Sequence, residues 1–267
     1  MCNGTLMDKL ISFAIPLMLS GILQLMFNAV DIIVVGRFSG SQSLAAVGST
    51  TALINVFTNL FIGISLGANV LAARYYALEK SKEMSETVHT AIAFALISGV
   101  GMAVIGLLMA KPALELMGTP DDVIAKSTLY MRIYFCGMPF FMLYNYGAAI
   151  LRAVGDTKRP LIFLLISGVI NAILNLFLVI QFHLDVAGVG IATVISQLIS
   201  CILVLRCLFC SESSYQFRPE KLNIRSRYLR QIFEVGIPAG IQSTVINLSN
   251  AMLQSSVNSF GSISMAG

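Results

Sequence analysis

Charged residues are scarce in this sequence. Asp, Glu, Lys and Arg together make up 11% of the 267 residues, whereas a typical soluble domain has about 25%. Hydrophobic residues account for 57%, and the mean hydropathy is +0.83. This composition excludes an ordinary soluble domain. Most apolar blocks approach or exceed the roughly 20 residues that cross a bilayer as a helix, and the alternating pattern of outer-membrane barrels is not found. We predict an all-α integral membrane protein.

Residues that bind metals or form disulfides are also few. The cysteines are Cys2, Cys136, Cys201, Cys207 and Cys210. An odd number without framework spacing argues against structural disulfides. Cys207 and Cys210 form a C-x-x-C without a second pair, and we interpret them as small apolar residues near a helix end. His89 and His183 lack further metal ligands and are predicted to be surface residues. No phosphate-binding glycine loop, H-E-x-x-H or EF-hand pattern occurs, so we expect no enzyme, no cofactor and no nucleic-acid partner.

The apolar residues fall into seven segments. They cover residues 10–35, 44–73, 89–110, 124–151, 161–181 and 187–209, and the seventh begins near 232. The breaks between them are short and rich in turn-forming residues, so neighbouring helices should be antiparallel. We predict an N-terminal six-helix transmembrane lobe over 1–209, a basic cytoplasmic linker over 210–231, and the first helix of a second lobe over 232–267.

The basic residues predict the orientation in the membrane, because Lys and Arg accumulate in cytoplasmic loops. One set of loops contains Lys9, Arg74, Lys80, Lys82, Arg152, Lys158, Arg159, Arg206, Arg218, Lys221, Arg225, Arg227 and Arg230. The opposite set contains only Arg37, Lys111, Lys126 and Arg132. The N-terminus is therefore predicted to be cytoplasmic. The basic stretch "KLNIRSRYLR" before the seventh segment is expected to lie on the anionic lipids of the cytoplasmic leaflet.

The first and seventh segments resemble each other at an offset of 222 residues. Ile15 and Pro16 then match Ile237 and Pro238, Asn28 matches Asn250, and Phe38 matches Phe260. Six crossings separate the two segments, so the repeats should be parallel, as in transporters built from two similar bundles. We expect the chain to be part of a protein of roughly twice 222 residues, in which a missing C-terminal lobe forms the other wall of a central cavity.

Asp31 is the acidic residue of the first apolar segment past its polar start. Gln24 and Asn28 precede it at helical spacing and share its face. Asp31 is about five residues from the outer loop, which is about 8 Å at 1.5 Å per residue. Pro16 lies toward the other end and predicts a bend, because its ring removes a backbone hydrogen bond. An ionised carboxylate inside a membrane costs at least ~2.5 kcal/mol on insertion scales, and a bound proton or cation would relieve that cost.

Other segments carry polar residues at helical spacing. Asn171 and Asn175 are four residues apart in the fifth segment, Asn55 and Thr58 are close together in the second, and Gln197 lies in the sixth. Pooled across helices, such side chains can line a hydrated cavity. They can instead act as hydrogen-bonding glue between helices, worth about 0.6 kcal/mol each. The sequence leaves both interpretations open for the amides.

Ser65 lies in a G-x-S-x-G match from Gly63 to Gly67. That motif marks a nucleophile only on a strand-to-helix turn with a histidine partner, whereas here it lies within an apolar helix. The same glycines form a G-x-x-x-G pattern, as do Gly236 and Gly240 in the seventh segment. Such patterns are typical of close helix–helix packing. We keep an intramembrane serine hydrolase as a distant alternative.

Three stretches resemble the multidrug and toxic compound extrusion (MATE) family of efflux transporters. They are "FNAVDIIVVGRFSGSQSLAAVG", "ILRAVGDTKRPLIFLLISGVINAILNLFLVI" and "DVAGVGIATVISQ". The resemblance implies twelve helices in two six-helix lobes that form a V around a central cavity. It also implies export of amphipathic organic cations in exchange for H⁺ or Na⁺, by alternating access, in a prokaryotic cell membrane.

The resemblance assigns roles to particular positions. The family's helix 1 carboxylate corresponds to Asp31, and its helix 5 polar pair corresponds to Asn171 and Asn175. Part of the family has a carboxylate where this sequence has Asn175. The full set of expected residues is Asp31, Asn171, Asn175, Asn28 and Gln24 for cation coupling, Asn55, Thr58 and Gln197 for the cavity, and Pro16, Gly155, Asp156, Thr157 and Pro160 for hinges or gates.

Two further alternatives remain. A lipid or polysaccharide flippase of the same superfamily would have basic residues in its cavity, whereas the charge within these segments is mainly acidic. A membrane protein that only binds partners would not need polar stripes in four segments. The sequence therefore favours a cation-coupled antiporter whose partners are membrane lipids, cationic drug-like molecules and the second lobe.

Overall fold

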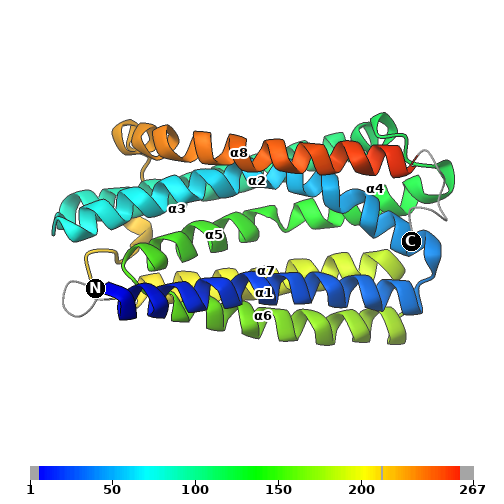
Figure 1. Ribbon diagram of the computed structural model, residues 1–267, viewed down its shortest axis with the longest axis horizontal. Helices are drawn as coiled ribbons and strands as arrows, with labels where there is room; N and C mark the ends of the chain where they lie inside the picture. The colour runs from blue at the N-terminus through cyan, green and yellow to red at the C-terminus, as the bar shows by residue number, and fades with distance from the viewer. Residues whose placement is uncertain (1–5, 212, 259–267) are drawn as a thin grey trace.

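The chain folds into an elongated helical bundle in a computed structural model that describes residues 6–211 and 213–258 (Figure 1). The α-helices are α1 Leu6–Phe38, α2 Ser41–Ala77, α3 Ser81–Leu116, α4 Asp121–Cys136, α5 Met138–Ala153, α6 Lys158–Leu176, α7 Asp185–Phe209 and α8 Ser226–Asn258. A π-helical turn, Phe177–Gln181, continues α6, and a 3₁₀ turn, Pro219–Lys221, lies in the linker. No strand occurs in these two ranges. The predicted all-α fold is confirmed.

Five helical stretches are long and apolar enough to cross a membrane. They are Leu10–Phe38, Ser41–Ala77, Ser81–Leu116, Lys158–Gln181 and Asp185–Phe209. They match five of the six segments predicted for the N-terminal lobe. Large apolar side chains cover the outside of the bundle, such as Leu25 and Leu108, each 71% exposed. An apolar outer surface of this extent suits lipid rather than water.

The remaining segment, predicted as one helix over 124–151, is broken in the structure. α4 ends at Cys136, and α5 begins at Met138. Gly137 forms the break: its N–H donates to the Tyr134 carbonyl at 3.0 Å, and its own carbonyl accepts from Phe140 at 3.1 Å. Pro139, two residues after Gly137, has no N–H to continue the ladder. Hydropathy could not show this break because both helices are apolar.

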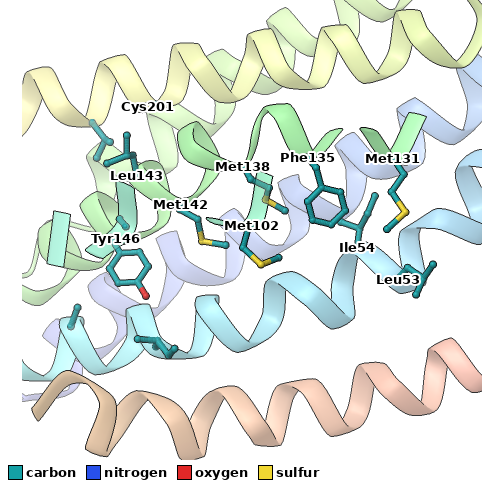
Figure 2. Close-up of a cluster of buried hydrophobic side chains, with 14 of the residues drawn as sticks. Leu53, Ile54, Met102, Met131, Phe135, Met138, Met142, Leu143, Tyr146 and Cys201 are labelled. Atoms are coloured by element: carbon teal, nitrogen blue, oxygen red, sulfur yellow. The ribbon is translucent and has the colours of Figure 1, made fainter. Parts of the chain in front are cut away.

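The core lies where α2, α3, α4 and α5 meet. Figure 2 shows this cluster, in which Met102 of α3 lies near Phe135 of α4 and Met138 of α5. All three side chains are buried. Methionine is flexible and fills irregular gaps well, which suits a core built around a helix break. Tyr146 adds a hydrogen bond, because its buried hydroxyl donates to the Phe61 carbonyl of α2 at 3.2 Å.

α8 packs along α2 through glycines. A Cβ atom added to Gly236 would lie 2.5 Å from the Cα of Ile64, and one added to Gly240 would lie 2.6 Å from the Leu60 carbonyl oxygen. Gly63 and Gly67 face the backbone of α8 equally closely. The structure thus confirms both predicted G-x-x-x-G packing faces, which meet each other.

α1 and α8 support the predicted repeat in shape. Each spans 33 residues with an internal proline, Pro16 or Pro238, and both run in the same direction in Figure 1. α8 begins at Ser226, ahead of the position near 232 expected from hydropathy. Phe260 lies outside the described residues. The domain boundaries remain a prediction.

The glycine contact gives a test of the packing. Gly240→Ala should destabilise the protein by about 1–3 kcal/mol, because the new methyl group forces two backbones apart. Gly21→Ala is the matched control, since nothing lies within 4 Å of its Cβ position. It should be neutral or stabilise the α1 helix by up to about 1 kcal/mol. The melting temperatures of the full-length variants in detergent measure both effects, and equal shifts would contradict this packing.

Candidate functional site

Asp31 of α1 belongs to a chain of hydrogen bonds across three helices. The side-chain amide of Asn175 on α6 donates to the Asp31 carboxylate and to Asn171 Oδ1 at 3.1 Å. The Asn171 amide donates in turn to Thr193 Oγ1 of α7 at 3.5 Å, and the Thr193 hydroxyl donates to the Val189 carbonyl at 2.9 Å. The four-residue spacing of the two asparagines places both amides on one face of α6. We call Asp31, Asn171, Asn175 and Thr193 the Asp31 cluster.

The Asp31 cluster is buried but not fully paired. Asn175 has no exposed surface and Asn171 is 5% exposed, whereas Asp31 is partly exposed. Asn175 Oδ1 has no hydrogen-bond partner among the described residues. A buried carbonyl oxygen without a donor is costly. The cluster therefore presents oxygen atoms, from carboxylate, amides and hydroxyl, of the kind that bind hard cations.

The donor set fits a proton or a small cation better than a transition metal. No group of three or more His, Cys, Asp or Glu residues lies close enough to hold a metal ion within the described ranges. Asp31 would supply the charged oxygen ligand of a Na⁺ site, whereas Asn175 presents its Nδ2 to Asp31 and Asn171. A proton would need only the carboxylate of Asp31.

Three residues near Asp31 were not identified from the sequence. Thr193 joins the Asp31 cluster directly. Tyr130 and Tyr134 of α4 lie within electrostatic reach of Asp31, and their ring centroids are 6.2 Å apart. The sequence contains a spacing pattern that could have identified each of these residues. Thr193 lies four residues before Gln197 on the polar stripe of α7, and the tyrosines are four residues apart in an apolar segment.

Gln24 and Asn28 are not brought to Asp31. Both side chains are exposed, and no hydrogen bond in the described part of the chain joins either to the carboxylate. The spacing places them on one side of α1 as predicted, but the middle of α1 is covered only in part, by contacts such as that of Phe27 with Gly168. Between Pro16 and Val34 this helix has no fully buried residue.

The residues predicted to line a cavity are placed in different environments. Thr58 is 3% exposed, and its hydroxyl donates to the Asn55 carbonyl of the same helix at 3.4 Å. Asn55 is half-buried. Gln197 Oε1 is buried and has no hydrogen-bond partner among the described residues. It lies beside the helix break, where a Cβ on Gly137 would be 2.6 Å from it.

The predicted hinge residues lie at one end of the bundle. Gly155 has a φ of +88°, a conformation that glycine adopts without strain. Asp156 Oδ1 accepts the Arg159 N–H at 3.1 Å and so caps the start of α6, while Thr157 is buried beside it. The Pro160 carbonyl accepts the Tyr144 hydroxyl at 3.2 Å.

α1 comes close to this turn. A pocket of about 450 Å³ is lined by Ser12 and Phe13 of α1 and by residues 154–158. Pro16 lies one turn further along α1 and is buried. Its carbonyl accepts the Ser20 hydroxyl at 2.8 Å. A bend at Pro16 would therefore move the wall of a pocket that the α5–α6 turn forms.

Ser65 has the surroundings of a packing residue. It lies within α2, and its hydroxyl donates to the Ile62 carbonyl of the same helix at 2.6 Å. His183 is exposed in the turn before α7. His89 is 3% exposed, so its predicted surface position is wrong: the linker covers it. Its ring contacts the backbone of Ser85 and Arg218. No contact that the structure records joins Ser65 to a base.

An ion pair closes the opposite end of the bundle. Lys126 Nζ of α4 lies 2.7 Å from Asp185 Oδ2 at the start of α7, and it donates to Ser43 Oγ of α2 at 2.8 Å. Three helices are thereby held together at the level of the predicted outer loops. Lys126 lies one turn before Tyr130, so α4 links this ion pair to the region of Asp31.

A helical membrane lobe with a paired carboxyl at depth has the features of a secondary transporter. The family model that matches residues 16–177 is MatE. The chain therefore belongs to this family, the MATE transporters, as its motifs suggested. These proteins are transporters, not enzymes.

Curated proteins that are similar in sequence are named for the same kind of transport. The chain is 34% identical over 257 residues to the probable multidrug resistance protein YoeA of Bacillus subtilis. This alignment covers 94% of this chain and 56% of the relative. It is 24% identical over 264 residues to the multidrug export protein MepA of Staphylococcus aureus, with 95% and 56% coverage. The chain spans about half the length of the curated relatives it matches.

Solved structures show the same fold. A MATE protein in the bent conformation superposes with a TM-score of 0.86 at 21% identity, covering 92% of this chain and 55% of that one. An inward-facing MATE family transporter gives a TM-score of 0.84 at 22% identity, with 91% and 55% coverage. The six-helix lobe and the first helix beyond it correspond to one half of such proteins.

Removing the central amide tests the Asp31 cluster. Asn175→Leu should lower stability by about 1–3 kcal/mol, because it removes a donor from a buried carboxylate and from Asn171. Asn145→Leu is the control, since Asn145 donates only to the Phe141 carbonyl of its own helix. It should cost less than about 1 kcal/mol. Thermal unfolding of both full-length variants provides the comparison, and an equal loss would show that the cross-helix bonds contribute nothing.

Proposed function

We propose that the chain forms the first lobe of a cation-coupled multidrug efflux antiporter and that Asp31 is its coupling carboxyl. The observation that carries the proposal is the Asp31 cluster: one carboxylate at membrane depth, bound by Asn175 and continued through Asn171 to Thr193. Family membership supports transport, and the relatives YoeA and MepA are named for multidrug resistance and export.

The chemistry of the coupling step follows from the pairing of Asp31. When the carboxyl is ionised, it accepts the Asn175 amide and holds α1 against α6. When it takes up a proton, it becomes a donor as well, and its hold on Asn175 weakens because charge-assisted hydrogen bonds are about twice as strong as neutral ones. A Na⁺ ion would instead compete for the same oxygens. Either cation changes the contact between α1 and α6.

Pro16 converts this local change into a movement of α1. The helix is weakly covered between Pro16 and Val34, and proline removes one rung of its backbone ladder. Cation binding at Asp31 would bend or shift α1 about Pro16 and reduce the space available to a bound drug. The drug would then be released outward, and the return of the cation inward would reset the site. The turn between α5 and α6 lies beside the end of α1 that would move, and it is held in place by Gly155, Asp156 and Thr157.

The cargo we propose is an amphipathic organic cation. The charge of the cluster is negative, and α4 contributes a pair of aromatic side chains, Tyr130 and Tyr134, whose ring centroids are 6.2 Å apart. Aromatic faces attract cations, by about 0.5–2 kcal/mol. The second lobe would complete the cavity. The protein would lie in a bacterial cell membrane with its N-terminus in the cytoplasm, surrounded by lipid.

Neutralising the carboxyl tests the assignment. Asp31→Asn should abolish drug resistance in cells and dye efflux in vesicles, because the amide cannot take up a proton and lacks the negative charge that attracts a coupling cation, while expression stays normal. Asp122→Asn is the matched control: Asp122 is exposed at the start of α4, so efflux should be unchanged. Full efflux by the Asp31 variant would refute the mechanism.

The coupling ion is identified by imposing one gradient at a time. Vesicles of the full-length protein should export dye when a Na⁺ gradient or a pH gradient is applied, and the effective gradient should lose its effect in Asp31→Asn. The amide retains the shape of the carboxyl but removes its charge, so only ion coupling is affected. If neither gradient drives dye movement in the unmodified protein, it is not a cation-coupled antiporter.

A further inference from the structure

The linker between α7 and α8 is fastened to α3 by two adjacent residues. His89 and Thr90 lie in the third turn of α3 and are 3% and 0% exposed. His89 binds the backbone of Arg218, and Thr90 binds the backbone of Asn223 and Arg225. All three partners belong to the segment that leads into the second lobe. This attachment is separate from the Asp31 cluster.

The His89 contacts fit a neutral ring that carries its proton on Nδ1. Nδ1 lies 2.6 Å from the Ser85 carbonyl oxygen, which can only accept, so Nδ1 carries a proton. Nε2 lies 3.1 Å from the Arg218 backbone nitrogen, whose N–H donates to it. The second nitrogen therefore acts as an acceptor in a neutral ring. Both ring nitrogens are used, one on α3 itself and one on the linker.

The same Nε2 atom has a second neighbour suited to the charged ring. The Arg218 carbonyl oxygen also lies 3.1 Å away. A protonated Nε2 is a donor and would face the Arg218 N–H, another donor, so that hydrogen bond would be lost. It would pair with the carbonyl instead. Protonation therefore exchanges one backbone partner of the linker for another, and it frees the Arg218 amide.

The Thr90 contacts do not depend on pH. The Thr90 hydroxyl accepts the Arg225 N–H at 3.3 Å and donates to the Asn223 carbonyl at 3.5 Å. A hydroxyl donates and accepts at once and does not titrate near neutral pH. The linker thus has one attachment that responds to protons and, a few residues on, one that does not.

Several charged groups surround the histidine. A pocket of about 340 Å³ beside the ring is lined by Glu86 of α3 and by Glu220, Lys221 and Arg225 of the linker, among others. Tyr228 at the start of α8 interacts with Glu86 and Arg227. The Phe217 ring packs against the imidazole with a centroid distance of 5.6 Å. The Arg218 guanidinium bonds Gln216 Oε1 at 2.9 Å. Acidic and basic side chains both lie near the His89 imidazole, so charged groups of either sign are available to the ring.

We infer that His89 is a proton-sensitive latch that fastens the interlobe linker to α3 through the Arg218 backbone. Histidine ordinarily changes charge between about pH 5 and 8. A fall in pH at this end of the bundle, which is predicted to face the cytoplasm, releases the Arg218 amide while Thr90 keeps its hold on Arg225. The linker stays attached to α3 through Thr90 and through the Arg218 carbonyl. The inference does not depend on Asp31 or on the transported substrate.

Single-residue amide hydrogen exchange of the full-length protein in nanodiscs tests the latch. The ratio of the Arg218 exchange rate to the Arg225 rate is measured from about pH 8 to about pH 5. Both amides belong to arginines, so the pH dependence of chemical exchange divides out of the ratio. The ratio should rise by roughly tenfold toward low pH, the factor expected when one hydrogen bond is lost.

Two variants make the assignment specific. His89→Gln keeps an amide oxygen to accept the Arg218 N–H but cannot titrate, so its ratio should stay low at every pH. His183→Gln removes the other histidine, which is exposed at the far end of α6, and it should keep the full rise. A flat ratio in the unmodified protein overturns the proposal, and so does an undiminished rise in His89→Gln. If His89→Gln fails to fold, the unmodified protein and His183→Gln still decide the outcome.

Discussion

The hydrogen bond from Asn175 to Asp31 is the interaction on which the first lobe depends most. A bilayer supplies no water, so each polar group at depth must be paired within the protein. Asn175 meets this demand for two residues at once, because its amide donates to Asp31 and to Asn171. α1 has few other buried contacts along its middle. Beside the apolar contact of Phe27 with Gly168, this amide is the polar link between α1 and α6, so a change at the carboxyl has a direct route into helix movement.

The two ends of the bundle are closed by different means. At the predicted outer end, Lys126 pairs with Asp185 and reaches Ser43, so an ion pair joins three helices. At the other end, His89 and Thr90 fasten a linker through its backbone, and Tyr75 of α2 donates to Gln231 of α8 at 3.0 Å. At that end, polar contacts also join the lobe to the linker and to α8, and at the outer end Ser255 of α8 donates to the Met117 carbonyl at 3.2 Å.

The sequence was most informative at positions where burying the residue in a membrane costs free energy. Asp31 stood out because a carboxylate in an apolar helix needs a reason, and the structure pairs it with Asn175 as the resemblance implied. Gln24 and Asn28 shared the right face but stayed exposed, because periodicity gives a direction around a helix and not what covers it. Thr193 was missed because a threonine hydroxyl can bond a carbonyl of its own helix, as it does with Val189, so its presence in an apolar helix needs no partner on another helix. The break at Gly137 was missed because hydropathy does not change across it.

His89 shows the other limit of sequence reasoning. Its burial is produced by a linker more than a hundred residues further along the chain, and nothing in its own helix indicates that cover. The glycine patterns were predicted more successfully, since Gly63 and Gly67 announce a close approach whatever the partner is. The sequence could not say that the partner would be α8, the helix with the second pair of glycines.

The glycine seam between α2 and α8 has a mechanical consequence. α8 belongs to the second repeat by sequence, yet its closest neighbour in the described structure is a helix of the first. At the glycines the two backbones come close with no side chain between them, whereas toward the start of α8 Tyr75 contacts the Tyr228 ring and the Gln231 side chain. Two such helices can slide or roll along each other in small steps, which is the geometry of a shear movement rather than of a hinge. A seam of this kind keeps α8 against α2 while allowing small relative displacements of the two helices.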